Sequence, residues 1–239
     1  MRQLALCIFL AISLSASAAE KPVAISYAPV GDVPNETMVS VKNVLNTHTS
    51  QVLEKYKIDN MPPVTVKVWQ NREDFEAAYG EDAKYVQGYV VHDSWEVRFF
   101  NGLPGLGFGV LHEYTHLVTL ALNPTFNNDP RWLWEATAIY ESKRPPVPEI
   151  SDLKCITHNS VPTLSSLNEH PFNIYKVGFF LVEFIETTWG RDTLLALVKF
   201  NGDTQEALGI SENDFEQRWL EFLRKNYHLN STDQYQLDC

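Results

Sequence analysis

The sequence predicts an α+β fold, with strands in the first part of the chain and helices in the rest. Three observations lead to this prediction. Valines alternate at Val64, Val66 and Val68, as in a strand with one buried face. Two further β-rich runs, 85–91 and 95–100, are joined by a short polar segment, which indicates a β-hairpin. Beyond the hairpin, apolar residues recur at helical spacing, so the strands precede most of the helices.

The helices are predicted from capping residues and helix breakers. Asn35 can cap the first helix, and Gly80 closes the second. The predicted helices cover residues 35–56, 71–79, 110–122, 129–143, 173–189 and 193–200, followed by a last amphipathic helix that begins at Ser211. The glycines between residues 105 and 109 are expected to form a loop that leads into the third of these helices, and residues 147–171 are expected to form another loop.

The N-terminal residues have the pattern of an export signal. Arg2 supplies a positive charge, Leu4–Leu14 is apolar apart from one serine, and Ala16-x-Ala18 offers a cleavage site. The apolar run is shorter than the ~20 residues that a membrane-spanning helix needs. We therefore expect a signal peptide at 1–19, a single domain at 20–239, no transmembrane anchor, and a periplasmic or extracellular protein.

Charge and cysteine content exclude some partners and suggest one crosslink. The chain has a formal net charge of −11 and no cluster of Lys and Arg, which argues against nucleic-acid binding. Removal of the signal peptide would leave Cys155 and Cys239. In an oxidising compartment these two residues can form one disulfide, and two free thiols are the alternative.

The most specific motif is His112-Glu113-Tyr114-Thr115-His116, an H-E-x-x-H sequence inside a predicted helix. Residues four apart lie on one helical face, so both imidazoles can reach one metal ion. Glu113 follows the first histidine and can reach a water molecule on that metal without being a ligand. The alternative is a helix with two incidental histidines.

A third ligand has to come from elsewhere in the chain. The extended motif that adds a third histidine would need His at position 122, which is Leu122. Glu135 lies in a largely apolar predicted helix, where an unpaired buried charge is very costly and a metal ion would neutralise it. A solvent-facing glutamate is the alternative.

These motifs resemble the gluzincin site of thermolysin-like and aminopeptidase-N-like metallopeptidases. The closest resemblance is to the peptidase-MA-like family of small exported proteins, whose second motif is W-x-x-E-G-x-A-x-Y. The positions in register are Trp132, Glu135, Ala138 and Tyr140, and further matches are Tyr175, Gly178, Phe180 and Trp189-Gly190. Ala136 departs from the family, which usually has Gly there. The resemblance spans residues 85–225.

The resemblance implies a zincin-like metallopeptidase domain with one zinc ion per chain. His112, His116 and Glu135 would be the zinc ligands, and Glu113 would be the general base that takes a proton from the attacking water. A tyrosine hydroxyl could stabilise the oxyanion. Tyr175 is the first candidate and Tyr140 the second, and for each the alternative is a core tyrosine.

Zincins also bind the substrate backbone along an exposed strand edge above the active-site helix. By this resemblance we expect residues 95–100 to be that edge, with an interior strand as the alternative. The G-x-M-E-N segment of aminopeptidases does not precede the zinc motif, and this favours an endopeptidase.

The sequence thus predicts an exported zinc metallopeptidase that acts on a peptide or protein substrate. The alternative is a zincin-fold module that binds zinc and serves partner or envelope recognition without proteolysis. The intact Glu113 argues against the alternative, because a site without catalysis could lose its base. Hydrolysis of a non-peptide amide would use the same residues.

Overall fold

The computed structural model describes residues 23–80, 86–142, 153, 156–169, 174–227 and 229. The predicted signal peptide at 1–19 and both cysteines of the predicted Cys155–Cys239 disulfide lie outside these residues. None of the described helices combines the length and the hydrophobicity needed to cross a bilayer.

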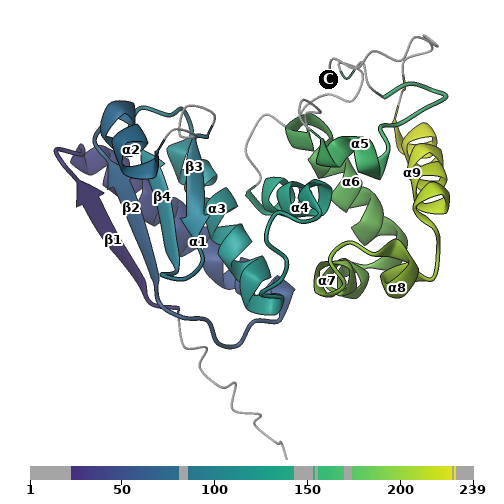
Figure 1. Cartoon of the computed structure of the whole chain (residues 1–239), viewed down its shortest axis with the longest axis horizontal. Coiled ribbons are helices and arrows are strands. Elements are labelled where there is room, and N and C mark those ends of the chain that lie inside the picture. The colour runs from purple at the N-terminus through teal and green to yellow at the C-terminus, as the bar shows by residue number, and fades with distance from the viewer. Residues whose placement is uncertain are drawn as a thin grey trace, which may run out of the picture.

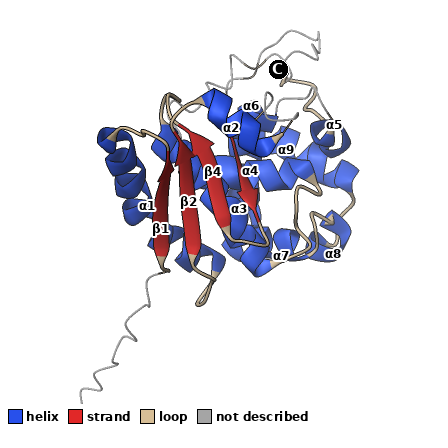
Figure 2. Ribbon diagram, turned by 60° about the vertical axis from the view of Figure 1, so that its left-hand side comes forward, coloured by secondary structure: helices blue, strands red, loops and turns tan. Residues whose placement is uncertain are grey.

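A small mixed sheet forms one side of the molecule (Figure 2). Its strands are β1 (Ile25–Val30), β2 (Val64–Trp69), β3 (Gly88–Val91) and β4 (Glu96–Phe100), in the order β1-β2-β4-β3. The first three strands in this order are parallel, and β3 pairs antiparallel with β4. The three alternating valines of β2 are fully buried, so the strand and the hairpin predicted from the sequence are both confirmed.

The structure corrects the prediction that residues 95–100 form the exposed edge. β4 is an interior strand, because β2 pairs with it on one side, from Thr65 opposite Glu96 to Trp69 opposite Phe100, and β3 pairs with it on the other. Its backbone groups are therefore used on both sides. Among the described strands, β3 has a single partner and is the edge next to the following helix.

Two helices pack together beside the sheet, α1 (Asn35–Tyr56) and α3 (Leu106–Leu122), while α2 (Arg72–Tyr79) follows β2. Gly107 and Gly109 lie inside α3, so the predicted glycine loop is wrong beyond Gly105. A Cβ on Gly107 would lie 2.6 Å from the Val44 side chain of α1, and a Cβ on Gly109 would lie 3.1 Å from Phe99 of β4. The glycines therefore allow α3 to approach both neighbours closely.

The second part of the described chain is helical. Its elements are α4 (Arg131–Ser142), α5 (Leu164–Asn168), α6 (Ile174–Trp189), α7 (Arg191–Lys199), α8 (Thr204–Leu208) and α9 (Glu212–Asn226). The two short helices, α5 and α8, were not predicted. The Ser211 side chain accepts a hydrogen bond from the Asp214 backbone and caps α9 as expected. Figure 1 shows the sheet at one end, helices α5 to α9 at the other, and α3 and α4 between them.

A buried ion-pair cluster ties the two parts together. The Glu141 carboxylate at the end of α4 is 1% exposed and accepts hydrogen bonds from Lys55 of α1 at 2.7 Å and from Arg191 of α7 at 2.6 Å. Arg191 also pairs with Glu186 of α6 and lies over the ring of Tyr56. The cluster therefore fixes the C-terminal end of α4 against three other helices.

Candidate metal centre

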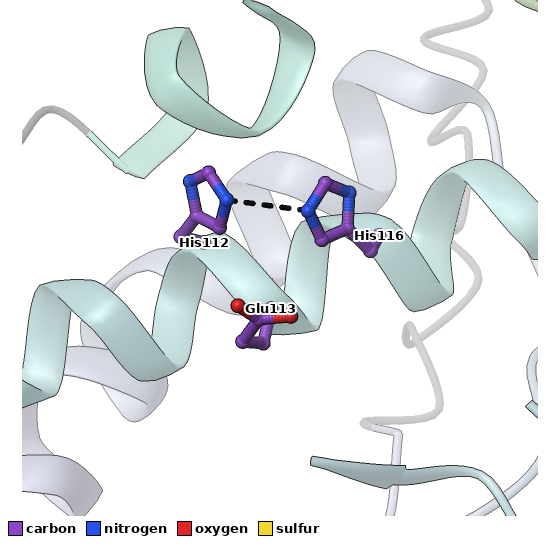
Figure 3. Close-up of side chains that lie close together, drawn as sticks. All are labelled: His112, Glu113 and His116. Carbon is purple, nitrogen blue, oxygen red and sulfur yellow. Dashed lines mark hydrogen bonds between the residues drawn. The ribbon is translucent and has the colours of Figure 1, made fainter. Parts of the chain in front are cut away.

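Helix α3 presents two histidines side by side. His112 and His116 are one turn apart, and their Nε2 atoms lie 3.2 Å from each other (Figure 3). Glu113 lies between them along the helix, and one ligand atom from each of the three residues falls within 4.8 Å of the others. His112, Glu113 and His116 therefore form a group that could hold a metal ion.

A third side chain reaches the same point from α4. The Glu135 carboxylate oxygen Oε2 lies 3.2 Å from His112 Nε2 and 3.9 Å from His116 Nε2. Glu135 is 8% exposed, so the alternative of a solvent-facing glutamate is excluded. The packing of α4 on α3 thus brings Glu135 to His112, which lies 23 positions earlier in the chain, and to His116.

The pKa values of Glu135 and His116 favour the protonation states in which these side chains can bind a metal ion. Burial by itself raises the pKa of Glu135. Its hydrogen bond with His112 and its electrostatic interactions with His116, His112 and Arg131 lower this pKa to about 2. Burial and the neighbouring His112 lower the pKa of His116 to about 3. At neutral pH the carboxylate is therefore ionised and His116 is neutral, which are the forms that bind metals.

Glu113 has a different environment from Glu135. Burial raises its pKa to about 7, with His112 opposing the shift and the negative charge of Glu135 adding to it. A carboxyl group with a pKa near 7 can both take and return a proton at neutral pH. The two glutamates of the site are thus suited to separate tasks, one as a permanent anion and the other as a proton acceptor.

Trp134 supports His116 and was missed at the sequence level. Its indole and the imidazole have centroids 4.1 Å apart and planes within 3° of parallel. His116 is 3% exposed, and its Nδ1 atom has no hydrogen-bond partner within the described part of the chain. Stacking on Trp134 therefore helps to orient the ring, together with the contact between its Nε2 atom and His112. The only signal in the sequence was the position of Trp134 next to Glu135.

Tyr175 of α6 reaches the centre, as predicted. Its ring centroid lies 6.2 Å from that of His112, and its hydroxyl is close enough to the Glu135 carboxylate for the two groups to interact electrostatically. Burial and the charge of Glu135 raise its pKa, so the hydroxyl stays protonated. The residue is nevertheless 51% exposed, which excludes a core tyrosine. Gly178, one turn later, lets α6 approach α4, because a Cβ there would lie 3.0 Å from the Ala136 Cα.

The structure does not bring Tyr140 to the centre. Its ring packs on Phe179 with centroids 5.2 Å apart, and its hydroxyl interacts electrostatically with Glu186 of α6. Five residues after Glu135, it is about 140° further around α4, so it faces another part of the interface with α6.

Arg131 is a second residue that the sequence reasoning missed. It precedes Glu135 by four positions, and its guanidinium carbon lies 5.6 Å from the centroid of the Tyr175 ring. The i, i+4 spacing was the signal that could have placed it on the same face of α4 as Glu135. A cation therefore borders the candidate centre.

Comparisons of the chain with protein-family models, with curated proteins and with solved structures found no match.

Proposed function

We propose that the protein is an exported zinc metallopeptidase that hydrolyses peptide bonds, with Glu113 as general base and endopeptidase action favoured. The observation that carries the proposal is the convergence of His112, His116 and Glu135 on one point, with a carboxylate oxygen of Glu113 within 4.8 Å of the two histidine ligand atoms. Two imidazoles and one carboxylate are a donor set typical of catalytic zinc, which takes three protein ligands and keeps a position open.

The distances between these three atoms support zinc. Sides of 3.2, 3.2 and 3.9 Å define a triangle whose corners are all about 2.0 Å from a common point, close to the length of a Zn–N or Zn–O bond. The arrangement also leaves two imidazole nitrogens facing each other at hydrogen-bond distance. Each neutral imidazole carries a single proton, so binding of a cation by both Nε2 atoms would require the tautomers that carry this proton on Nδ1.

Bound zinc would supply a Lewis acid that polarises the substrate carbonyl and acidifies a water molecule. The Glu113 carboxylate accepts the proton of that water as its oxygen attacks the carbonyl carbon, and returns the proton to the leaving amine. The Tyr175 hydroxyl donates a hydrogen bond to the oxyanion that develops.

The corrected sheet order supports a place for the substrate backbone. β3 is one of the two edge strands among the described strands, and it packs against α3, the helix that carries both histidines. An extended peptide can add to such an edge through backbone hydrogen bonds, and these bonds do not require a free N- or C-terminus of the peptide. This mode of binding favours internal cleavage.

Metal content and hydrolysis measured together test the proposal. Purified mature protein, Glu113→Gln and the exposed control Glu221→Gln are analysed by elemental mass spectrometry and then incubated with an unfolded protein substrate. We expect one zinc ion per chain in all three, and loss of turnover by about 10²-fold or more in Glu113→Gln alone.

Each other outcome has a definite meaning. Wild-type turnover in Glu113→Gln would remove Glu113 from the mechanism. Zinc without hydrolysis of any substrate would favour the non-proteolytic module. Absence of zinc after reconstitution would overturn the proposal.

A further inference from the structure

The side chain of Arg131 is incompletely satisfied. Its Nη1 atom is buried and has no hydrogen-bond partner within the described residues. Two other partly buried arginines show the usual situation, since Arg98 bonds Glu96 and Tyr89, and Arg191 bonds Glu141 and Glu186. A guanidinium carries five N–H donors, and leaving one buried without an acceptor costs free energy.

The position of Arg131 does not stabilise its helix. It is the first residue of α4, where the helix dipole is positive and a cation is unfavourable. The charge of Arg131 interacts with that of Glu135 at a distance, but no ion pair joins the two within the described chain, and the carboxylate faces His112. The interaction with Glu135 therefore leaves the buried Nη1 donor of Arg131 without an acceptor.

The surroundings of Arg131 point toward the reacting centre. Its guanidinium lies over the ring of Tyr175, which is half exposed and lies beside His112. The planar fork of donors matches a carboxylate, which it binds through two parallel hydrogen bonds. The chain as a whole has a net charge of −11, so it repels anions at long range. An acidic ligand would therefore need a local cation to be held at this site.

We propose that Arg131 binds a carboxylate of the substrate next to the scissile bond, so that the preferred substrates are peptides with an acidic group at that position. This inference rests on the proposed peptidase function and names its substrate class. The carboxylate can be an Asp or Glu side chain, or the free C-terminus of the peptide. Both present the same two oxygens, and the experiment separates them.

Binding is measured without hydrolysis. Four fluorescent five-residue alanine peptides carry either Glu or Gln at the centre and end in either a carboxylate or an amide. Each is titrated against zinc-loaded Glu113→Gln protein, in which position 131 is either the native arginine or changed by Arg131→Gln or Arg131→Lys. Arg218→Gln, on the exposed face of α9, is the charge-matched control in the same background. Zinc content and melting temperature establish that each variant is folded and loaded.

We expect the peptides with a carboxylate to bind about tenfold to a hundredfold more tightly than their neutral twins. This difference should disappear in Arg131→Gln, persist in part in Arg131→Lys and be unchanged in Arg218→Gln. A preference that follows the central Glu identifies the side chain as the source, and one that follows the terminal carboxylate identifies the C-terminus. Equal affinities for all four peptides, or a preference that survives Arg131→Gln, would overturn the inference.

Cleavage of a peptide library by wild-type and Arg131→Gln protein separates this inference from the proposed function. We expect acidic residues or C-termini to be enriched beside the cleaved bonds, with the enrichment lost and KM for these peptides raised in the variant. A uniform fall in kcat without any change in preference would place Arg131 on the oxyanion and contradict the inference. Carboxylate-dependent binding without any cleavage would contradict the peptidase function while leaving the inference standing.

Discussion

The imidazole of His116 lies flat against the indole of Trp134, with ring centroids 4.1 Å apart and planes within 3° of parallel. Trp134 immediately precedes Glu135 on α4, so one helix supplies both a candidate ligand and the support of another. Side chains that orient metal ligands typically contribute 10–100-fold to metal affinity.

We therefore expect Trp134→Leu to weaken zinc binding about tenfold, because the ring of His116 becomes free to rotate. Competition with a chromophoric chelator measures this affinity. Trp219→Leu is the matched control, since Trp219 is also buried but lies on α9. Both variants should lose stability, and only Trp134→Leu should lose zinc affinity. Equal zinc affinities would show that the stacking does not position His116.

Two buried glutamates on α4 allow a test of the third ligand. Glu135→Ala should reduce zinc affinity by more than about 100-fold, because the only carboxylate in the triangle of donors is removed. Glu141→Gln should bind zinc normally but lower the free energy of unfolding by about 3 kcal/mol, because Lys55 and Arg191 lose a buried anionic partner. Elemental analysis and urea unfolding distinguish the two. Full zinc content in Glu135→Ala would assign the third ligand elsewhere.

Tyr175 and Tyr140 provide a matched pair of hydroxyl deletions. Tyr175→Phe should lower kcat by about 10²–10³-fold with zinc content and KM nearly unchanged, because the hydroxyl acts on the oxyanion in the transition state. Tyr140→Phe should leave kcat unchanged, since the Tyr140 hydroxyl interacts with Glu186 of α6 and lies away from the metal centre. Steady-state kinetics on the same peptide measure both. An unchanged rate in Tyr175→Phe would make that tyrosine a mere neighbour of the site.

The sheet contains a carboxylate whose ionisation should make stability depend on pH. Burial opposes ionisation of Glu96, but its hydrogen bonds with Lys67 and Arg98 lower its pKa below the ordinary value of 4.5. A lowered folded-state pKa means that this stabilisation is complete above the unfolded-state pKa and is lost as the pH falls through the folded-state value.

Glu96→Gln should therefore lower the free energy of unfolding by about 1 kcal/mol at pH 7. Below pH 4 the difference from wild type should shrink toward zero. Urea unfolding at a series of pH values measures it. A difference that stays constant from pH 7 to pH 3 would show that the ion pairs of Glu96 are not its source.

Much of the local structure and part of the site were predictable from the sequence. The i, i+4 spacing of His112 and His116 places both imidazoles on one helical face whatever the helix packs against. The high cost of burying an unpaired charge singled out Glu135 in its apolar helix. The alternation of valines determined β2, and Ser211 with Asp214 determined the start of α9. In each case the relevant interactions are within one element or follow from its periodicity.

The remaining features depend on how the elements pack. Strand order makes β3 an edge strand and β4 an interior strand. No pattern within residues 95–100 could reveal this order. Gly107 and Gly109 lie inside α3, where the neighbouring side chains occupy the space that a Cβ would need. Rotation around α4 separated Tyr140 from the centre, and the packing of α3 and α6 on α4 gave Trp134 and Arg131 their contacts. Distances between elements decide these roles, and a linear sequence carries no direct measure of them.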